Sequence, residues 1–145
     1  MLLAASMAII MIVIGIVIHN ECLQYTTGLL HRLRGLPPRL HVVIGVGMCF
    51  IAHIAEIIVY AFFHYALAEN SVIDHSMVDQ SLRFRDFVYF SAETYTSLGY
   101  GDIELLSENL RFLGGLEAMI GLVLIAWTAS FTYFLMEKYW RDKKH

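Results

Sequence analysis

Three long apolar stretches constrain the fold of this chain more than any other feature. They cover residues 2–18, 41–67 and 112–136, and crossing the hydrocarbon core of a bilayer as a helix takes about 20 residues. Hydrophobic residues make up 58% of the sequence and charged residues 16%. This composition argues against a soluble enzyme, a disordered tail and a nucleic-acid-binding protein. We therefore expect an all-α membrane protein that spans the bilayer three times and is not an enzyme.

The charges of the connecting segments predict an orientation. Residues 21–40 carry three arginines against one glutamate, and the C-terminal end is also basic. Residues 68–111 carry eight acidic side chains against three arginines. Because basic loops stay on the cytoplasmic side, we expect a cytoplasmic basic loop at 21–40 and a cytoplasmic tail at 140–145. The N-terminus would then lie outside the plasma (inner) membrane.

A shorter apolar piece, residues 87–95, lies between the second and third stretches. It is too short to cross a bilayer, so it is either a surface helix or a re-entrant helix packed inside protein. Asp86 precedes it and is a suitable N-cap, because its side chain can accept the free N–H groups of the first turn. The piece is followed by the run Thr96-Ser97-Leu98-Gly99-Tyr100-Gly101-Asp102.

This run resembles the selectivity filter of potassium channels, which reads Thr-Val-Gly-Tyr-Gly. The resemblance to the bacterial two-transmembrane, pore-loop channels covers about two-thirds of the chain and leaves an extra N-terminal transmembrane helix at residues 1–20. It implies a pore domain at 41–139, with an outer helix at 41–67, a pore helix at 86–96, a filter at 97–102 and an inner helix at 110–137. It also implies a homotetramer around a central pore, with potassium ions as the permeant ligand and no cofactor.

The backbone chemistry of such a filter agrees with the residues present. A dehydrated cation needs a cage of oxygens, and an extended backbone supplies one only if successive carbonyls point the same way. That requires alternating backbone handedness, which glycine tolerates best, and Gly99 and Gly101 are spaced accordingly. The ion-coordinating residues are then expected in the run Thr96, Ser97, Leu98, Gly99, Tyr100 and Gly101.

The sequence departs from the family pattern at two filter positions. Ser97 stands where threonine is usual, and Leu98 where valine or isoleucine is usual. Serine keeps the hydroxyl ligand and loses a packing methyl group, and leucine adds bulk behind the filter. A nonselective cation channel on the same fold therefore remains an alternative to a potassium-selective one.

Two further features accompany the filter. Glu93 and Asp102 are expected to support it as a carboxyl pair that shares a proton, or else Glu93 is solvated or bonds to backbone amides. Gly121 stands about where the inner helix of the family carries a hinge glycine, and it could equally be a close-packing point.

His53, Glu56, Tyr60 and His64 share one face of the second stretch. Ionisable groups within a membrane span are costly and often functional. Three interpretations stay open: a metal site at His53, Glu56 and His64, a proton-sensitive gate, or a hydrogen-bonded seam. The first would make the chain a membrane metal-binding or sensor protein.

The expected partners are other copies of the chain and the lipid bilayer. No nucleic acid is expected, and a regulatory protein is left open.

Overall fold

Four α-helices make up the fold in the computed structural model, which describes residues 2–69, 82–103 and 107–141. They are α1 (Leu2–Arg32), α2 (Pro38–Glu69), α3 (Phe84–Tyr95) and α4 (Glu108–Arg141), and no strand occurs within the described residues. Most of the acidic connection between α2 and α3 and the last four residues of the expected tail lie outside them. The expected all-α architecture is confirmed.

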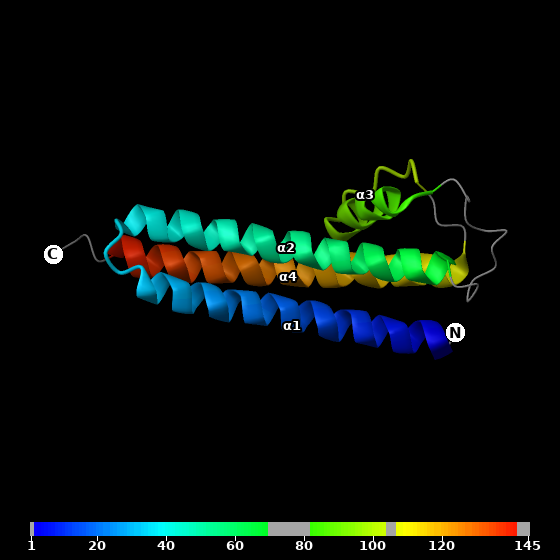
Figure 1. Ribbon diagram of the computed structural model, residues 1–145, viewed down its shortest axis with the longest axis horizontal. Helices are drawn as coiled ribbons and strands as arrows, with labels where there is room; N and C mark the ends of the chain where they lie inside the picture. The colour runs from blue at the N-terminus through cyan, green and yellow to red at the C-terminus, as the bar shows by residue number, and fades with distance from the viewer. Residues whose placement is uncertain (1, 70–81, 104–106, 142–145) are drawn as a thin grey trace.

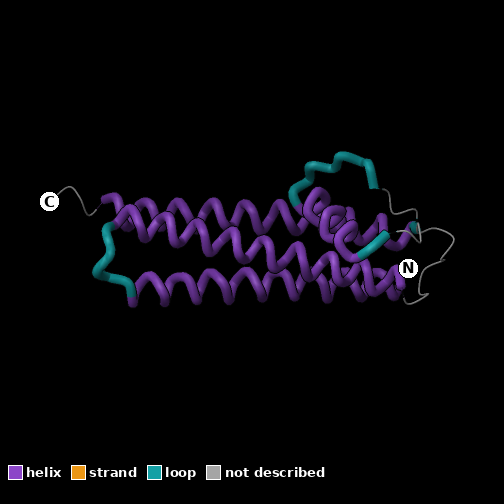
Figure 2. Tube along the Cα trace, turned by 45° about the horizontal axis from the view of Figure 1, so that its top comes forward, coloured by secondary structure: helices purple, strands orange, loops and turns teal. Residues whose placement is uncertain are grey.

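The three long helices lie side by side, and the short α3 packs at one end of them (Figure 1). α1 contacts α2 and α4, and α3 contacts the same two helices. The N-terminus lies at the end of the bundle that carries α3, and the C-terminus lies at the opposite end (Figure 2). The chain therefore leaves α2, forms α3 and begins α4 all at one end, as a re-entrant helix requires.

The distribution of side chains on α2 is that of a protein embedded in lipid. Phe50, Ile54, Ile58 and Phe62 follow one another at intervals of one helical turn and are all exposed. The opposite face buries Glu56 and His64 and partly buries His53. Such an arrangement, apolar outside and polar inside, suits hydrocarbon rather than water. All three long helices are long and apolar enough to cross a membrane, and the chain is a multi-pass membrane protein.

The first helix is longer than the sequence predicted. The N-terminal helix was expected at 1–20 and a loop at 21–40, whereas α1 continues to Arg32 and α2 already begins at Pro38. The extension is stabilised by packing, because Leu23 and Leu30 are buried against the bundle. Proline fits the first turn of a helix, where its missing N–H is not needed, and this sets the start of α2.

Asp86 is not the N-cap of α3, as the sequence suggested, but lies three residues further in. Arg83 holds the N-cap position, and its backbone N–H donates to Oδ2 of Asp86 at 2.7 Å. The carboxylate of Asp86 still stabilises the first turn of α3. It accepts the backbone N–H of Arg83, and its negative charge lies near the positive N-terminal end of the helix dipole.

Gly121 marks the closest approach between α4 and α3. A Cβ atom built on it would lie 2.1 Å from the carbonyl oxygen of Tyr95. α4 runs unbroken through this position, so in this conformation Gly121 serves close packing rather than bending.

We therefore expect Gly121→Ala to destabilise the protein by about 1–3 kcal/mol, because the added methyl group meets backbone that cannot move aside cheaply. Thermal unfolding of the detergent-purified protein measures the effect. Gly47→Ala is the matched control, since Gly47 lies on the exposed side of α2 with no atom within 4 Å of an added Cβ. Equal unfolding temperatures for the two variants would contradict the packing role.

Candidate functional site

The C-terminal end of α3 delivers the chain into the predicted filter through a defined turn. After the C-cap Thr96, the N–H of Ser97 donates to the carbonyl of Thr94 at 2.9 Å, and the N–H of Leu98 donates to the carbonyl of Glu93 at 2.8 Å. This pair of bonds is a Schellman motif, which needs a left-handed residue after the cap. Ser97 takes that place with φ of 57°, at a cost of about 1–2 kcal/mol for a non-glycine residue.

Backbone handedness alternates along the predicted filter. Ser97, Gly99 and Gly101 have φ values of 57°, 54° and 75°, and they are the described residues with positive φ. The positive values at the two glycines agree with the alternation expected from the sequence. Every second residue of the segment 97–101 thus has a left-handed backbone conformation. The segment therefore does not have the backbone of a regular β-strand.

Glu93 holds this segment with three hydrogen bonds. Its backbone carbonyl accepts the N–H of Leu98 at 2.8 Å and that of Gly99 at 3.2 Å. Its side-chain Oε2 accepts the N–H of Tyr100 at 3.1 Å. The side chain is almost fully buried, so three consecutive amides of the predicted filter converge on one residue of α3.

These bonds also fix the direction of the carbonyl groups. In a trans peptide the C=O of one residue points opposite to the N–H of the next, and the described part of the chain has no cis peptide bond. The carbonyls of Ser97, Leu98 and Gly99 must therefore point away from Glu93. They form a row on the open side of the segment, where Leu98 and Tyr100 are also exposed.

The carboxylate expected to pair with Glu93 has a different partner. Asp102 Oδ2 accepts the hydroxyl of Tyr89 at 3.1 Å, while Glu93 takes a backbone amide, one of the two alternatives left open by the sequence. Loss of solvent contact and the bond to Asp102 raise the pKa of the Tyr89 hydroxyl. The hydroxyl of Thr96, which was expected among the ion-coordinating residues, donates to the carbonyl of Ala92 at 2.7 Å. This side chain therefore bonds to the last turn of α3.

A sequence model of an ion channel family matches residues 48–138, which hold most of α2, all of α3, the predicted filter and most of α4. The chain belongs to this two-transmembrane, pore-loop ion channel family. No curated protein and no solved structure matches it. The matched region leaves α1 as the extra N-terminal helix of the channel.

A groove of about 410 Å³ opens beside the predicted filter of the channel. It lies between α3 and residues 111–118 of α4. Its lining includes the apolar or small residues Phe90, Gly99, Gly115 and Ala118 together with the charged residues Glu93 and Arg111. The groove thus flanks the same segment whose carbonyls point outward.

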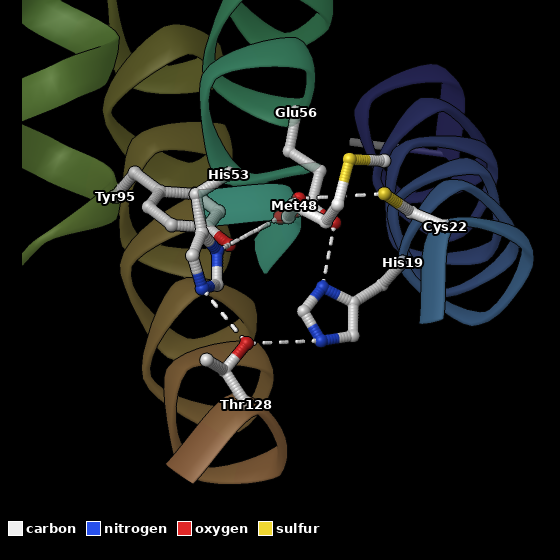
Figure 3. Close-up of polar contacts among 7 residues, drawn as sticks. All are labelled: His19, Cys22, Met48, His53, Glu56, Tyr95 and Thr128. Carbon is white, nitrogen blue, oxygen red and sulfur yellow. Dashed lines mark hydrogen bonds and ion pairs between the residues drawn. The ribbon is translucent and has the colours of Figure 1, made fainter. Parts of the chain in front are cut away.

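Glu56 is the centre of a buried polar network that includes Tyr95 at the end of α3 (Figure 3). Its Oε1 lies 2.9 Å from Nδ1 of His19, and its Oε2 lies 3.2 Å from Nδ1 of His53. The hydroxyl of Tyr95 donates to Oε2 at 2.5 Å. Thr128 Oγ1 contacts Nε2 of both histidines, so all four helices meet at this carboxylate.

The structure separates His64 from the residues with which the sequence grouped it. His64 Nε2 lies 2.7 Å from Oε2 of Glu117 on α4, and both side chains are fully buried. The place expected for His64 beside His53 and Glu56 is taken by His19 of α1. Sequence analysis did not single out His19, although an ionisable residue at the end of an apolar stretch was a signal that it could have used.

We expect Glu93→Ala to free the Tyr100 amide, because the variant removes the only side-chain acceptor that this amide contacts among the described residues. A hydrogen bond to a charged group is worth about 1.5–3 kcal/mol, so protection of the Tyr100 amide from hydrogen exchange should fall about tenfold to a hundredfold. Glu93→Gln keeps an acceptor oxygen and is the control. Unchanged protection in Glu93→Ala would contradict the contact.

Proposed function

We propose that four copies of this chain form a potassium-selective channel that conducts passively through residues 96–101. The observation that carries the proposal is the row of outward carbonyls at Ser97, Leu98 and Gly99, imposed by the bonds of their neighbours to Glu93. Carbonyl oxygens are the ligands with which potassium channels replace the hydration shell of the ion. The C-terminal end of α3 adds the negative end of a helix dipole next to the same segment.

The proposed assembly of four chains follows from the fact that each chain supplies a single row of carbonyl oxygens. One chain supplies oxygens on one side of an ion, so further copies are needed to surround it. Leu98 is 57% exposed and Tyr100 is 68% exposed in the single chain, which leaves both free for contact with a neighbour. The groove between α3 and α4 offers such a neighbour a place to pack.

The proposed orientation puts the filter end outside the cell. The connection between α1 and α2 lies at the end of the bundle far from α3 (Figure 1), and it carries Arg32, Arg34 and Arg39 in or beside it. The start of the C-terminal basic segment is at the same end. Basic segments favour the cytoplasmic side, so α3 would enter from outside.

Selective flux tests the ion specificity. Purified protein in liposomes should carry potassium down its gradient and exclude sodium, and the reversal potential in mixed salts should follow potassium alone. A reversal potential that follows both ions would instead favour the nonselective cation channel suggested by Ser97 and Leu98. Absence of any flux would contradict the proposed function.

Gly99→Ala should abolish this flux. Alanine at φ of 54° is strained by about 1–2 kcal/mol, and every copy in the assembly would carry the strain at the ion path. Potassium flux measured beside Gly47→Ala, which adds the same methyl group on the exposed side of α2, separates the filter from general damage. Wild-type flux in Gly99→Ala would refute the filter assignment.

The oligomeric state is a separate prediction. Native mass spectrometry from detergent should give the mass of four 16.5-kDa chains, because fewer rows of carbonyls leave the ion partly without ligands. A monomer or dimer that still conducts potassium would contradict the fourfold pore.

A further inference from the structure

We propose that His19, His53 and Glu56 bind a divalent transition metal ion of the zinc type, with the hydroxyl oxygen of Tyr95 as the fourth ligand. The site lies where α1, α2 and α3 meet (Figure 3), and none of its four residues belongs to the predicted filter at 97–102. It does not depend on the proposed conduction of potassium.

The donor atoms converge closely enough to hold one ion. One ring nitrogen of His19, one of His53 and a carboxylate oxygen of Glu56 all lie within 4.8 Å of one another, and Nδ1 of each ring lies within 3.2 Å of a Glu56 oxygen. Tyr95 Oη lies 2.7 Å from His53 Nδ1 and 2.5 Å from Glu56 Oε2. Ligands of a tetrahedral zinc ion, with bonds of about 2.0–2.1 Å, lie about 3.3 Å apart. Small movements of a few side chains would therefore admit the ion.

Thr128 places both imidazoles in the orientation of metal ligands. Its Oγ1 lies 2.9 Å from Nε2 of His53 and 3.3 Å from Nε2 of His19. An imidazole whose Nε2–H donates to this oxygen turns its Nδ1 lone pair toward the carboxylate of Glu56, where a metal ion could accept it. In the metal-free network each Nδ1 can carry the proton instead and donate to the carboxylate, so binding of the ion would go with a change of tautomer. Histidine ligands of metals usually donate their other N–H to an oxygen in this way.

Charge balance favours the same ligand set in a membrane. The Glu56 side chain is fully buried, and an unpaired charge is costly there. A divalent ion would displace the hydroxyl proton of Tyr95, which leaves for the solvent, and form a bond to the phenolate oxygen. The carboxylate and the phenolate then balance the two positive charges.

The donor types select the class of metal. Two imidazole nitrogens with two oxygens suit zinc and its transition-metal neighbours, whereas magnesium and calcium prefer oxygen alone. Cys22 lies one turn after His19 but turns its thiol toward the carbonyl of Met48, so we leave it out of the ligand set. His53 keeps 16% of its side chain exposed, while His19 and Glu56 keep none, which makes His53 the side from which an ion would approach.

Metal titration of the full chain in detergent tests the site. After removal of bound metal with a chelator, cobalt(II) should bind at one ion per chain and give the intense visible absorption of a tetrahedral site, and zinc should displace it. His19→Ala and Glu56→Gln should weaken cobalt affinity more than a hundredfold. Thr128→Val, which removes the oxygen behind both histidines, should weaken it by about 10–100-fold.

Two controls separate the site from general effects. His64→Gln changes a buried histidine of α2 outside the site, which pairs with Glu117, and His31→Ala changes a surface histidine of α1; both should keep wild-type cobalt affinity. Wild-type protein that binds no stoichiometric cobalt or zinc would overturn the proposal and would leave a hydrogen-bonded network without metal. Cobalt affinity unchanged in both His19→Ala and Glu56→Gln would overturn it as well. None of these experiments measures potassium flux. A negative result for metal binding would therefore leave the proposed potassium conduction unaffected.

Discussion

Polar groups inside a membrane protein must find their partners within the protein, because the surrounding hydrocarbon offers none. Three glutamates meet this requirement here. Glu93 accepts three consecutive amides of the predicted filter, Glu56 contacts two histidines and a tyrosine, and Glu117 contacts His64. Glu56 and Glu117 join segments far apart in the sequence, and Glu56 links the end of α3 to α1 and α2, so a buried carboxylate supports the placement of α3 beside apolar packing.

The network around Glu56 gives the extra helix a structural role in the channel. His19 lies in α1, outside the residues that match the ion channel family. Through Glu56 it is linked to Tyr95, the last residue of α3, which directly precedes the turn into the predicted filter. A change in the protonation or ligand state of this cluster would therefore act first on the end of α3.

Sequence analysis recovered the three spans and the re-entrant helix because length, hydropathy and paired glycines are local signals. It also gave the alternation of handedness at Gly99 and Gly101. Periodicity showed that His53, Glu56 and His64 share a face, yet eight residues separate the last two, about 12 Å along a helix. The tertiary structure decides which helix packs beside each of these residues. The sequence therefore did not identify His19 as the partner of Glu56, or Glu117 as the partner of His64. The length of α1 was missed for a related reason, since packing of Leu23 and Leu30 continues the helix beyond its most apolar part.

In the proposed channel, Glu93 turns a row of main-chain oxygens toward a cation path shared by several chains. A density map of the assembled protein in a lipid nanodisc with potassium would show this arrangement directly. We expect four chains around one axis, the carbonyls of Ser97, Leu98 and Gly99 facing that axis, and ion density between them. Carbonyls turned toward Glu93, or an assembly whose axis lies away from this segment, would contradict this proposal.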